Sequence, residues 1–101
     1  MRKRKMQQDS DKELAKFAKA LAHPSRVQIL RFLEKQCTCF AGDIGEQLPL
    51  AASTVSQHLK VLRNAGLIQG KAEPPTITYC INQKNWQRAK TLFEEFFKQK
   101  A

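Results

Sequence analysis

The most informative segment of this chain is ASTVSQHLKVLRNAGLI, residues 52–68. Val55, Leu59 and Leu62 recur at spacings of four and three residues, which places them on one buried stripe of a helix. The rest of the helix carries short hydroxyl and amide groups and one cation, namely Ser53, Thr54, Ser56, Gln57 and Lys60. Such short groups let a helix approach a DNA groove closely, whereas a merely solvated face is normally richer in Glu and Lys. The pattern therefore predicts a helix that reads DNA.

Within this segment the expected roles differ from residue to residue. We expect the hydroxyls and Lys60 to contact phosphates, and Thr54 and Gln57 to lie nearer the bases. The alternative is an ordinary solvated helix in a domain that does not bind DNA. His58 lies three residues after Val55, on the inward side, and is predicted to be a packed, hydrogen-bonded residue. His23 is interpreted as a helix-boundary residue.

The chain is short and strongly basic. Its 101 residues are enough for one small domain, with too little mass for a catalytic cleft between lobes. Eighteen Lys and Arg against nine Asp and Glu give a formal charge of +9, which attracts polyanions. Nucleic acid is the usual partner of such a chain, and membrane headgroups are the competing one. No apolar run of about 18 residues occurs, so no membrane span is predicted.

Several functional classes are disfavoured by the sequence. The basic residues 2–5 are not followed by an apolar segment, so they are not a secretory signal, and we expect a cytoplasmic protein. An odd number of cysteines argues against a secreted disulfide framework. No cofactor-binding or metalloprotease motif occurs, so a thiol enzyme is a weak hypothesis and we expect no enzyme. An interaction module that binds RNA or a protein partner is the alternative to a DNA-binding regulator.

Periodicity and turn residues predict a mainly α fold with a small β-hairpin (α+β) in a single domain over residues 10–101. Residues 1–9 lack periodicity and are expected to form a basic, disordered arm. Residues 36–40 predict an extended link or a brief strand. Residues 67–71 and 76–81 flank a proline-rich turn and predict the hairpin. Helices are predicted from residue 10 or 11, over 24–35, over 43–48, over 52–64 and from residue 82 or 83 onward.

Two motifs carry a resemblance to a known family. ALAHPSRVQIL (residues 20–30) followed by STVSQHLKVLRNAGLI (residues 53–68) resembles the ArsR/SmtB family of bacterial winged-helix repressors. The resemblance runs from about Glu13 to Phe97. It implies a winged helix-turn-helix with five helices plus a wing, and a homodimer that places two recognition helices in successive major grooves of a palindromic operator. It also implies repression that is often relieved by a metal, a metalloid or a thiol oxidant.

Two adjacent positions depart from the family pattern. Ala51 stands where members usually have Ser or Thr, and Ala52 where Gln is common. An alanine before the helix forgoes an N-cap worth about 1 kcal/mol and one polar contact. The target sequence therefore cannot be carried over from relatives.

The last helix is more aromatic than a domain of this size can easily bury alone, and such a surplus marks an interface. Ordinary core packing is the alternative for part of it. Pairing with apolar residues of the first helix across a two-fold axis would cover the surplus. The predicted dimer interface consists of Leu14, Phe17, Leu21, Trp86, Leu92, Phe93, Phe96 and Phe97.

Three cysteines and one lysine of the hairpin complete the candidate sites. Cys37 and Cys39 alternate on one face of an extended segment, and Cys80 lies on the strand expected to pair with it. Three converging thiolates would suit arsenite or another thiophilic ion, or would be open to oxidation; the alternative is small apolar strand residues. No cofactor is required for the fold. Lys71 is a candidate phosphate contact, or else an edge-strand charge that discourages sheet aggregation.

Overall fold

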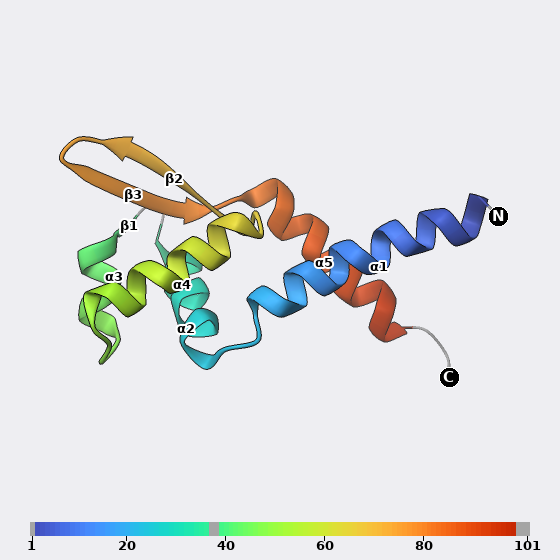
Figure 1. The fold of residues 1–101 in the computed structure, drawn as a ribbon, viewed down its shortest axis with the longest axis horizontal. Coiled ribbons are helices and arrows are strands. Elements are labelled where there is room, and N and C mark those ends of the chain that lie inside the picture. Colours follow the sequence, from blue (N-terminus) through green and yellow to red (C-terminus); the bar gives the residue numbers. More distant parts are fainter. Residues whose placement is uncertain (1, 37–38, 99–101) are drawn as a thin grey trace.

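A long first helix, α1 (Arg2–Ala20), extends away from the rest of the molecule (Figure 1). The computed structural model describes residues 2–36 and 39–98, with the side chains of residues 8–36, 42–72 and 74–98. The prediction of a disordered arm over residues 1–9 is wrong for residues 2–9, which are helical, and the helix does not begin at Ser10 or Asp11. Residues 2–9 contain no Gly or Pro and are rich in Arg, Lys, Met and Gln, which favour helix, so nothing interrupts α1 there.

The second helix, α2 (Pro24–Lys35), has the predicted bounds. Pro24 occupies the first turn, where its missing N–H costs no hydrogen bond. His23 is the N-cap residue, and its Nδ1 accepts a hydrogen bond from the backbone N–H of Ser25 at 3.1 Å. His23 is therefore a helix-boundary residue, as its position before a proline indicated.

A three-stranded antiparallel sheet follows the order β1-β3-β2. Its strands are β1 (Cys39–Phe40), β2 (Ile68–Glu73) and β3 (Thr76–Ile81). Strand β1 pairs Cys39 with Tyr79 and Phe40 with Thr78, which confirms a brief strand against the returning strand of the hairpin. The hairpin of β2 and β3 projects from the helices as the predicted wing (Figure 1).

The remaining helices are α3 (Ala41–Gln47), α4 (Ala52–Asn64) and α5 (Gln83–Lys98). Helix α4 has the predicted bounds, and α3 begins two residues earlier than expected. Together with the hairpin, the five helices confirm the winged helix-turn-helix fold class predicted from the sequence.

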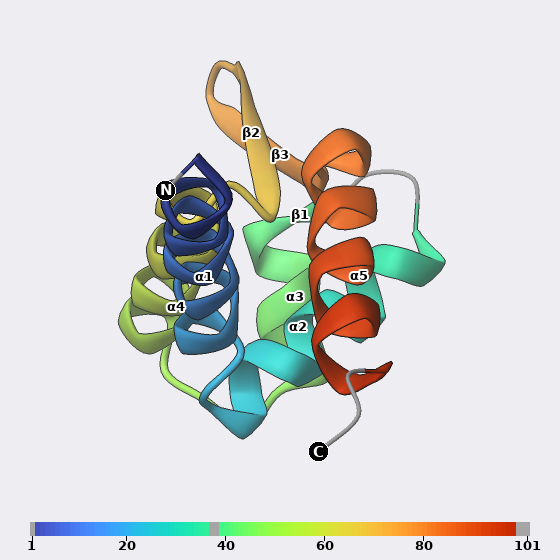
Figure 2. The same cartoon turned by 90° about the vertical axis from the view of Figure 1, so that its right-hand side faces the viewer.

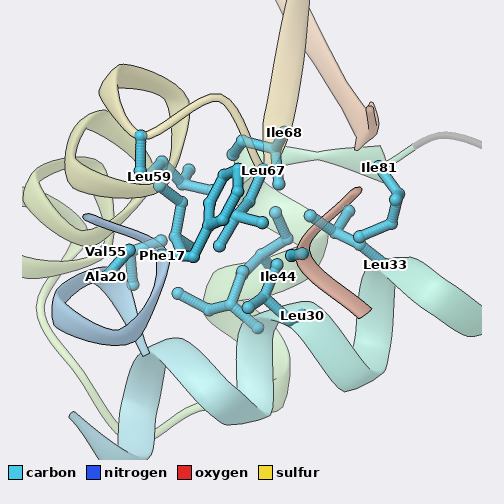
Figure 3. Close-up of a cluster of buried hydrophobic side chains, with 14 of the residues drawn as sticks. Phe17, Ala20, Leu30, Leu33, Ile44, Val55, Leu59, Leu67, Ile68 and Ile81 are labelled. Carbon is cyan, nitrogen blue, oxygen red and sulfur yellow. The ribbon is translucent and has the colours of Figure 1, made fainter. Parts of the chain in front are cut away.

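The hydrophobic core lies where the end of α1 meets α2, α3, α4 and the base of the sheet (Figure 3). Val55, Leu59 and Leu62 are 2%, 2% and 0% exposed, so the stripe predicted from their spacing is buried. Phe17 and Leu92 are also buried within the subunit, at 1% and 5% exposed. The structure therefore places these two predicted interface residues in the core, because α1 and α5 each turn one apolar face inward.

Helix α4 ends at a glycine that no other residue type can easily replace. Gly66 has φ +86°, in the left-handed region that side chains disfavour. Its carbonyl accepts a hydrogen bond of 2.8 Å from Nδ2 of Asn85, at the start of α5. A Cβ added at Gly66 would lie 2.7 Å from that same nitrogen.

We expect Gly66→Ala to lower the free energy of unfolding by about 1–3 kcal/mol, because it combines a strained φ with a collision against Asn85. Urea unfolding monitored by circular dichroism measures this change. Gly45→Ala is the matched control: Gly45 lies in helix α3 with no atom within 4 Å of an added Cβ, so it should be neutral or stabilising. Equal unfolding midpoints for the two variants would contradict the prediction.

Candidate nucleic-acid interface

The outward face of α4 carries the side chains predicted to contact DNA. Ser53, Ser56, Gln57 and Lys60 are exposed and Thr54 is half-buried, while the buried stripe lies on the opposite side of the helix. Ala51 is the N-cap residue and makes no side-chain cap bond, in agreement with the sequence analysis. No acidic residue lies in the first turn of α4, so no carboxylate there would repel a phosphate group that approaches the exposed face.

A cluster of His23, Arg26 and His58 joins α4 to the ends of α1 and α2. The His23 and His58 rings are 4.5 Å apart between centroids and tilted by 53°. Arg26 donates from Nε to the Ala20 carbonyl at 2.7 Å and from Nη2 to the Lys19 carbonyl at 3.3 Å. Its Nη1 lies 3.4 Å from Nδ1 of His58. These contacts satisfy the last carbonyls of α1 and hold α4 against the end of that helix.

His58 is the packed, hydrogen-bonded residue that its position on the inward side of α4 predicted. It is 8% exposed, and the pKa of its imidazole is lowered by burial, with smaller contributions from the neighbouring charges of His23 and Arg26. A neutral imidazole can accept a hydrogen bond at Nδ1, which is the form that the facing Arg26 requires. The role of Arg26 was missed, although it lies within the first motif that carried the family resemblance.

We expect the stability of the protein to fall as the pH drops below about 6.5, because the unfolded chain then binds a proton at residue 58 that the folded protein disfavours. The loss continues until the pH passes the lowered pKa of the folded state. Thermal melts at a series of pH values measure it, and His58→Gln should make the fall in Tm smaller. An identical fall in the wild type and the variant would contradict this assignment.

The wing places Lys71 on the exposed part of β2. Lys71 pairs with Thr78 in the sheet register, and its carbonyl accepts a hydrogen bond of 3.5 Å from Oγ1 of Thr78. Its exposed position on the projecting hairpin is compatible with a contact to a duplex flanking α4.

The predicted cysteine site falls partly outside the described residues. Cys37 and the side chain of Cys39 are not described, so the convergence of three sulfurs stays a prediction. Cys80 is half-buried, and its Sγ lies 3.6 Å from Nε2 of Gln69. The register pairs Cys39 with Tyr79, one residue from Cys80. Among the described side chains (residues 8–36, 42–72 and 74–98), no three His, Cys, Asp or Glu residues gather in a group that could hold a metal ion.

An apolar surface lies along α1 and α5, at the opposite end from the wing (Figure 1). Phe96 and Phe97 are 52% and 75% exposed, with their ring centroids 5.4 Å apart. A groove of about 540 Å³ between the two helices is lined by Asp11, Leu14, Ala15, Ala18, Phe93, Phe96 and Phe97. Leu21, Trp86 and Phe93 are half-buried and line a neighbouring hollow. Six of the eight predicted interface residues therefore keep surface that a partner could cover.

Comparisons with known proteins agree with the fold. The pattern of the family described as "Bacterial regulatory protein, arsR family" matches residues 23–69, which run from the cap of α2 to the start of β2. The HTH-type transcriptional regulator YgaV of Escherichia coli is 35% identical over 77 residues, 76% of this chain and 78% of that protein. CmtR of Mycobacterium tuberculosis, also an HTH-type transcriptional regulator, is 36% identical over 75% of this chain and 64% of its own length.

A solved structure extends the similarity over nearly the whole chain. The transcriptional regulator HlyU from Vibrio vulnificus matches with a TM-score of 0.69 and 32% identity, covering 95% of this chain and 99% of that one. Within the part of the chain that the structure describes, no helix has the length and apolar character needed to cross a bilayer. The chain belongs to the ArsR family of bacterial regulatory proteins, whose members are DNA-binding transcription regulators with a winged helix-turn-helix.

Proposed function

We propose that this protein is a homodimeric, sequence-specific transcriptional repressor that binds a palindromic operator, and that it acts by occupying DNA rather than by catalysis. The observation that carries the proposal is the exposed face of α4, where hydroxyl and amide groups stand with one lysine above a fully buried apolar stripe. Such a face fits the major groove of B-form DNA, which admits one helix and presents a distinct hydrogen-bonding pattern for each base pair.

The side chains of α4 divide between bases and backbone. Gln57 can make two hydrogen bonds to one base edge, and Thr54 can make one. Ser53, Ser56 and Lys60 supply donors for phosphates, with Lys71 of the wing as a further phosphate contact. Base contacts carry the sequence preference, whereas phosphate contacts carry affinity that depends on salt.

We expect Gln57→Ala and Lys60→Ala to have different effects on DNA binding. Gln57→Ala should cost about 1–3 kcal/mol on the operator and little on random duplex, because it removes base contacts. Lys60→Ala should weaken binding to all sequences similarly. It should also lower the salt slope, which is the slope of log affinity against log salt concentration. Fluorescence anisotropy with promoter DNA and random duplex at several salt concentrations measures both effects.

The wild-type protein is the reference for this comparison. It should prefer promoter DNA from its own operon over random duplex by at least about 10³. Equal affinity for the two duplexes would favour an interaction module that binds RNA or protein. An unchanged sequence preference in Gln57→Ala would remove this residue from base reading.

The apolar groove along α1 and α5 supports the homodimer. Two large aromatic side chains at the end of α5 remain exposed beside a hollow whose lining is mostly apolar. A two-fold pairing buries the same patch of both subunits at once. It would also present two copies of α4 to half-sites about 34–36 Å apart, one turn of DNA, on a single face of the duplex.

We expect Phe96→Gln/Phe97→Gln to weaken the dimer by about 30-fold or more, as loss of a hot spot worth about 2 kcal/mol would do. Analytical ultracentrifugation over a concentration series measures the dissociation constant of the dimer. Ile77→Gln is the matched control, since Ile77 is 43% exposed but lies on the wing, away from the groove. A variant that stays as dimeric as this control would place the interface elsewhere.

Release of the protein from DNA by a thiophilic metal, a metalloid or thiol oxidation stays a prediction. It rests on the family and on the sequence positions of Cys37, Cys39 and Cys80.

Repression rather than activation likewise rests on the family resemblance. A reporter gene under the chain's own promoter distinguishes repression from activation. Deletion of the gene for this protein should raise reporter expression if the protein is a repressor.

A further inference from the structure

Helix α1 carries a stripe of lysines that neither the core nor the apolar groove uses. Lys12, Lys16 and Lys19 are exposed and follow one another at spacings of four and three residues, so they share one face of α1. Two carboxylates between these lysines are turned elsewhere: Asp11 lines the groove against α5, and Oε1 of Glu13 accepts a hydrogen bond of 2.9 Å from Nε of Arg88 on α5. The end of the stripe that lies beside α4, Lys16 and Lys19, is therefore basic.

The stripe borders a shallow hollow that α4 completes. This hollow, of about 310 Å³, is called here the basic groove, and it is lined by Lys16, Lys19, Ala20, Arg26, Val61, Asn64 and Ala65. No carboxylate is among these lining residues. Figure 2 shows α1 and α4 on the same side of the molecule, with α5 on the other side.

The basic groove continues the DNA-reading face of α4. Gln57, Val61 and Asn64 follow at spacings of four and three residues, so they lie in one row along that helix. Val61 is 38% exposed although it is apolar, as expected for a residue at the floor of a shallow contact surface. A duplex seated on Gln57 would therefore pass over the row and approach the lysines of α1.

The charged groups of the groove differ in their availability. Arg26 is held in place by two carbonyls and by His58, which use three of its five N–H donors, so its position is fixed by the fold. Lys16 has its Nζ 5.1 Å from the Phe17 ring centroid and remains exposed, and Lys19 is exposed too. Lysine ammonium groups on flexible stems are point charges without fixed geometry, which suits phosphates better than base edges.

We propose that the basic groove is a second DNA-contact surface, where Lys16 and Lys19 hold the phosphate backbone between the two half-sites of the operator. The proposal rests on the proposed function for the position of the duplex along α4 and for the pairing of subunits. In that arrangement α1 extends from α4 toward the apolar groove, which the partner subunit covers. The lysines of both subunits would then face the centre of the operator. The contact adds affinity without sequence preference.

The test compares Lys16→Gln/Lys19→Gln with Lys35→Gln/Lys84→Gln. Each double variant loses two positive charges per subunit, and all four lysines are exposed. Lys35 ends α2 and Lys84 lies in the first turn of α5, and neither lines the basic groove or the apolar groove. The affinity for promoter DNA is measured by anisotropy across a range of salt concentrations, and thermal melts confirm that both variants fold.

We expect the groove variant to lose about 0.9 units of salt slope for each phosphate contact removed, up to about four contacts in a dimer. Affinity should fall by at least tenfold relative to the control variant, while the ratio between promoter and random duplex stays the same. Hydroxyl-radical footprinting should show loss of protection only between the half-sites. A groove variant that matches the control in slope, affinity and footprint would overturn the proposal, as would a loss of sequence preference.

These results separate the groove from the proposed function. If wild-type protein does not discriminate promoter DNA, the proposed function fails, and the two variants are then compared on random duplex. A larger loss of affinity in the groove variant than in the control variant still supports a phosphate contact at the basic groove. Equal binding of the two variants to random duplex overturns it.

Discussion

The burial of one stripe of α4 is the constraint on which the rest of the molecule depends. Successive residues of a helix are rotated by about 100°, so fixing three positions in the core fixes the direction of every other side chain. Val55, Leu59 and Leu62 are almost fully covered, and burying each contributes about 1.5–3 kcal/mol. The core therefore decides which groups of α4 meet solvent, and hence which groups are available to a ligand.

A polar cluster supplements this apolar constraint at one end of the helix. Arg26 reaches the last carbonyls of α1 and the imidazole of His58 at the same time. The carbonyl ends of a helix need such donors, because they have no partner within the helix. One guanidinium thus ends α1, and its contact with His58 orients α4. The relative placement of the two helices is thus held in part by a residue that lies outside both of them, in α2.

The sequence predicted the elements that carry regular periodicity. The bounds of α2 and α4 follow from Pro24 and the apolar spacing, and the left-handed Gly66 marks the end of α4. The start of α1 was missed, since a polar helix without caps has no apolar pattern in its first turns. Phe17 and Leu92 were assigned to an interface because periodicity shows that a residue faces apolar material but not which molecule supplies it. The basic groove was missed for a related reason: its lining comes from three helices whose packing no local pattern specifies.

The junction at Gly66 has a mechanical consequence. Nδ2 of Asn85 holds the Gly66 carbonyl, and the backbone N–H of Asn82 donates to the carbonyl of Leu67 at 2.9 Å. The residues that join α4 to β2 and the beginning of α5 thus meet at one corner, through one side-chain and one main-chain hydrogen bond. The two hydrogen bonds couple the start of α5 to the end of α4 and the base of the hairpin, so a shift of α5 at this corner acts on both of these elements at once.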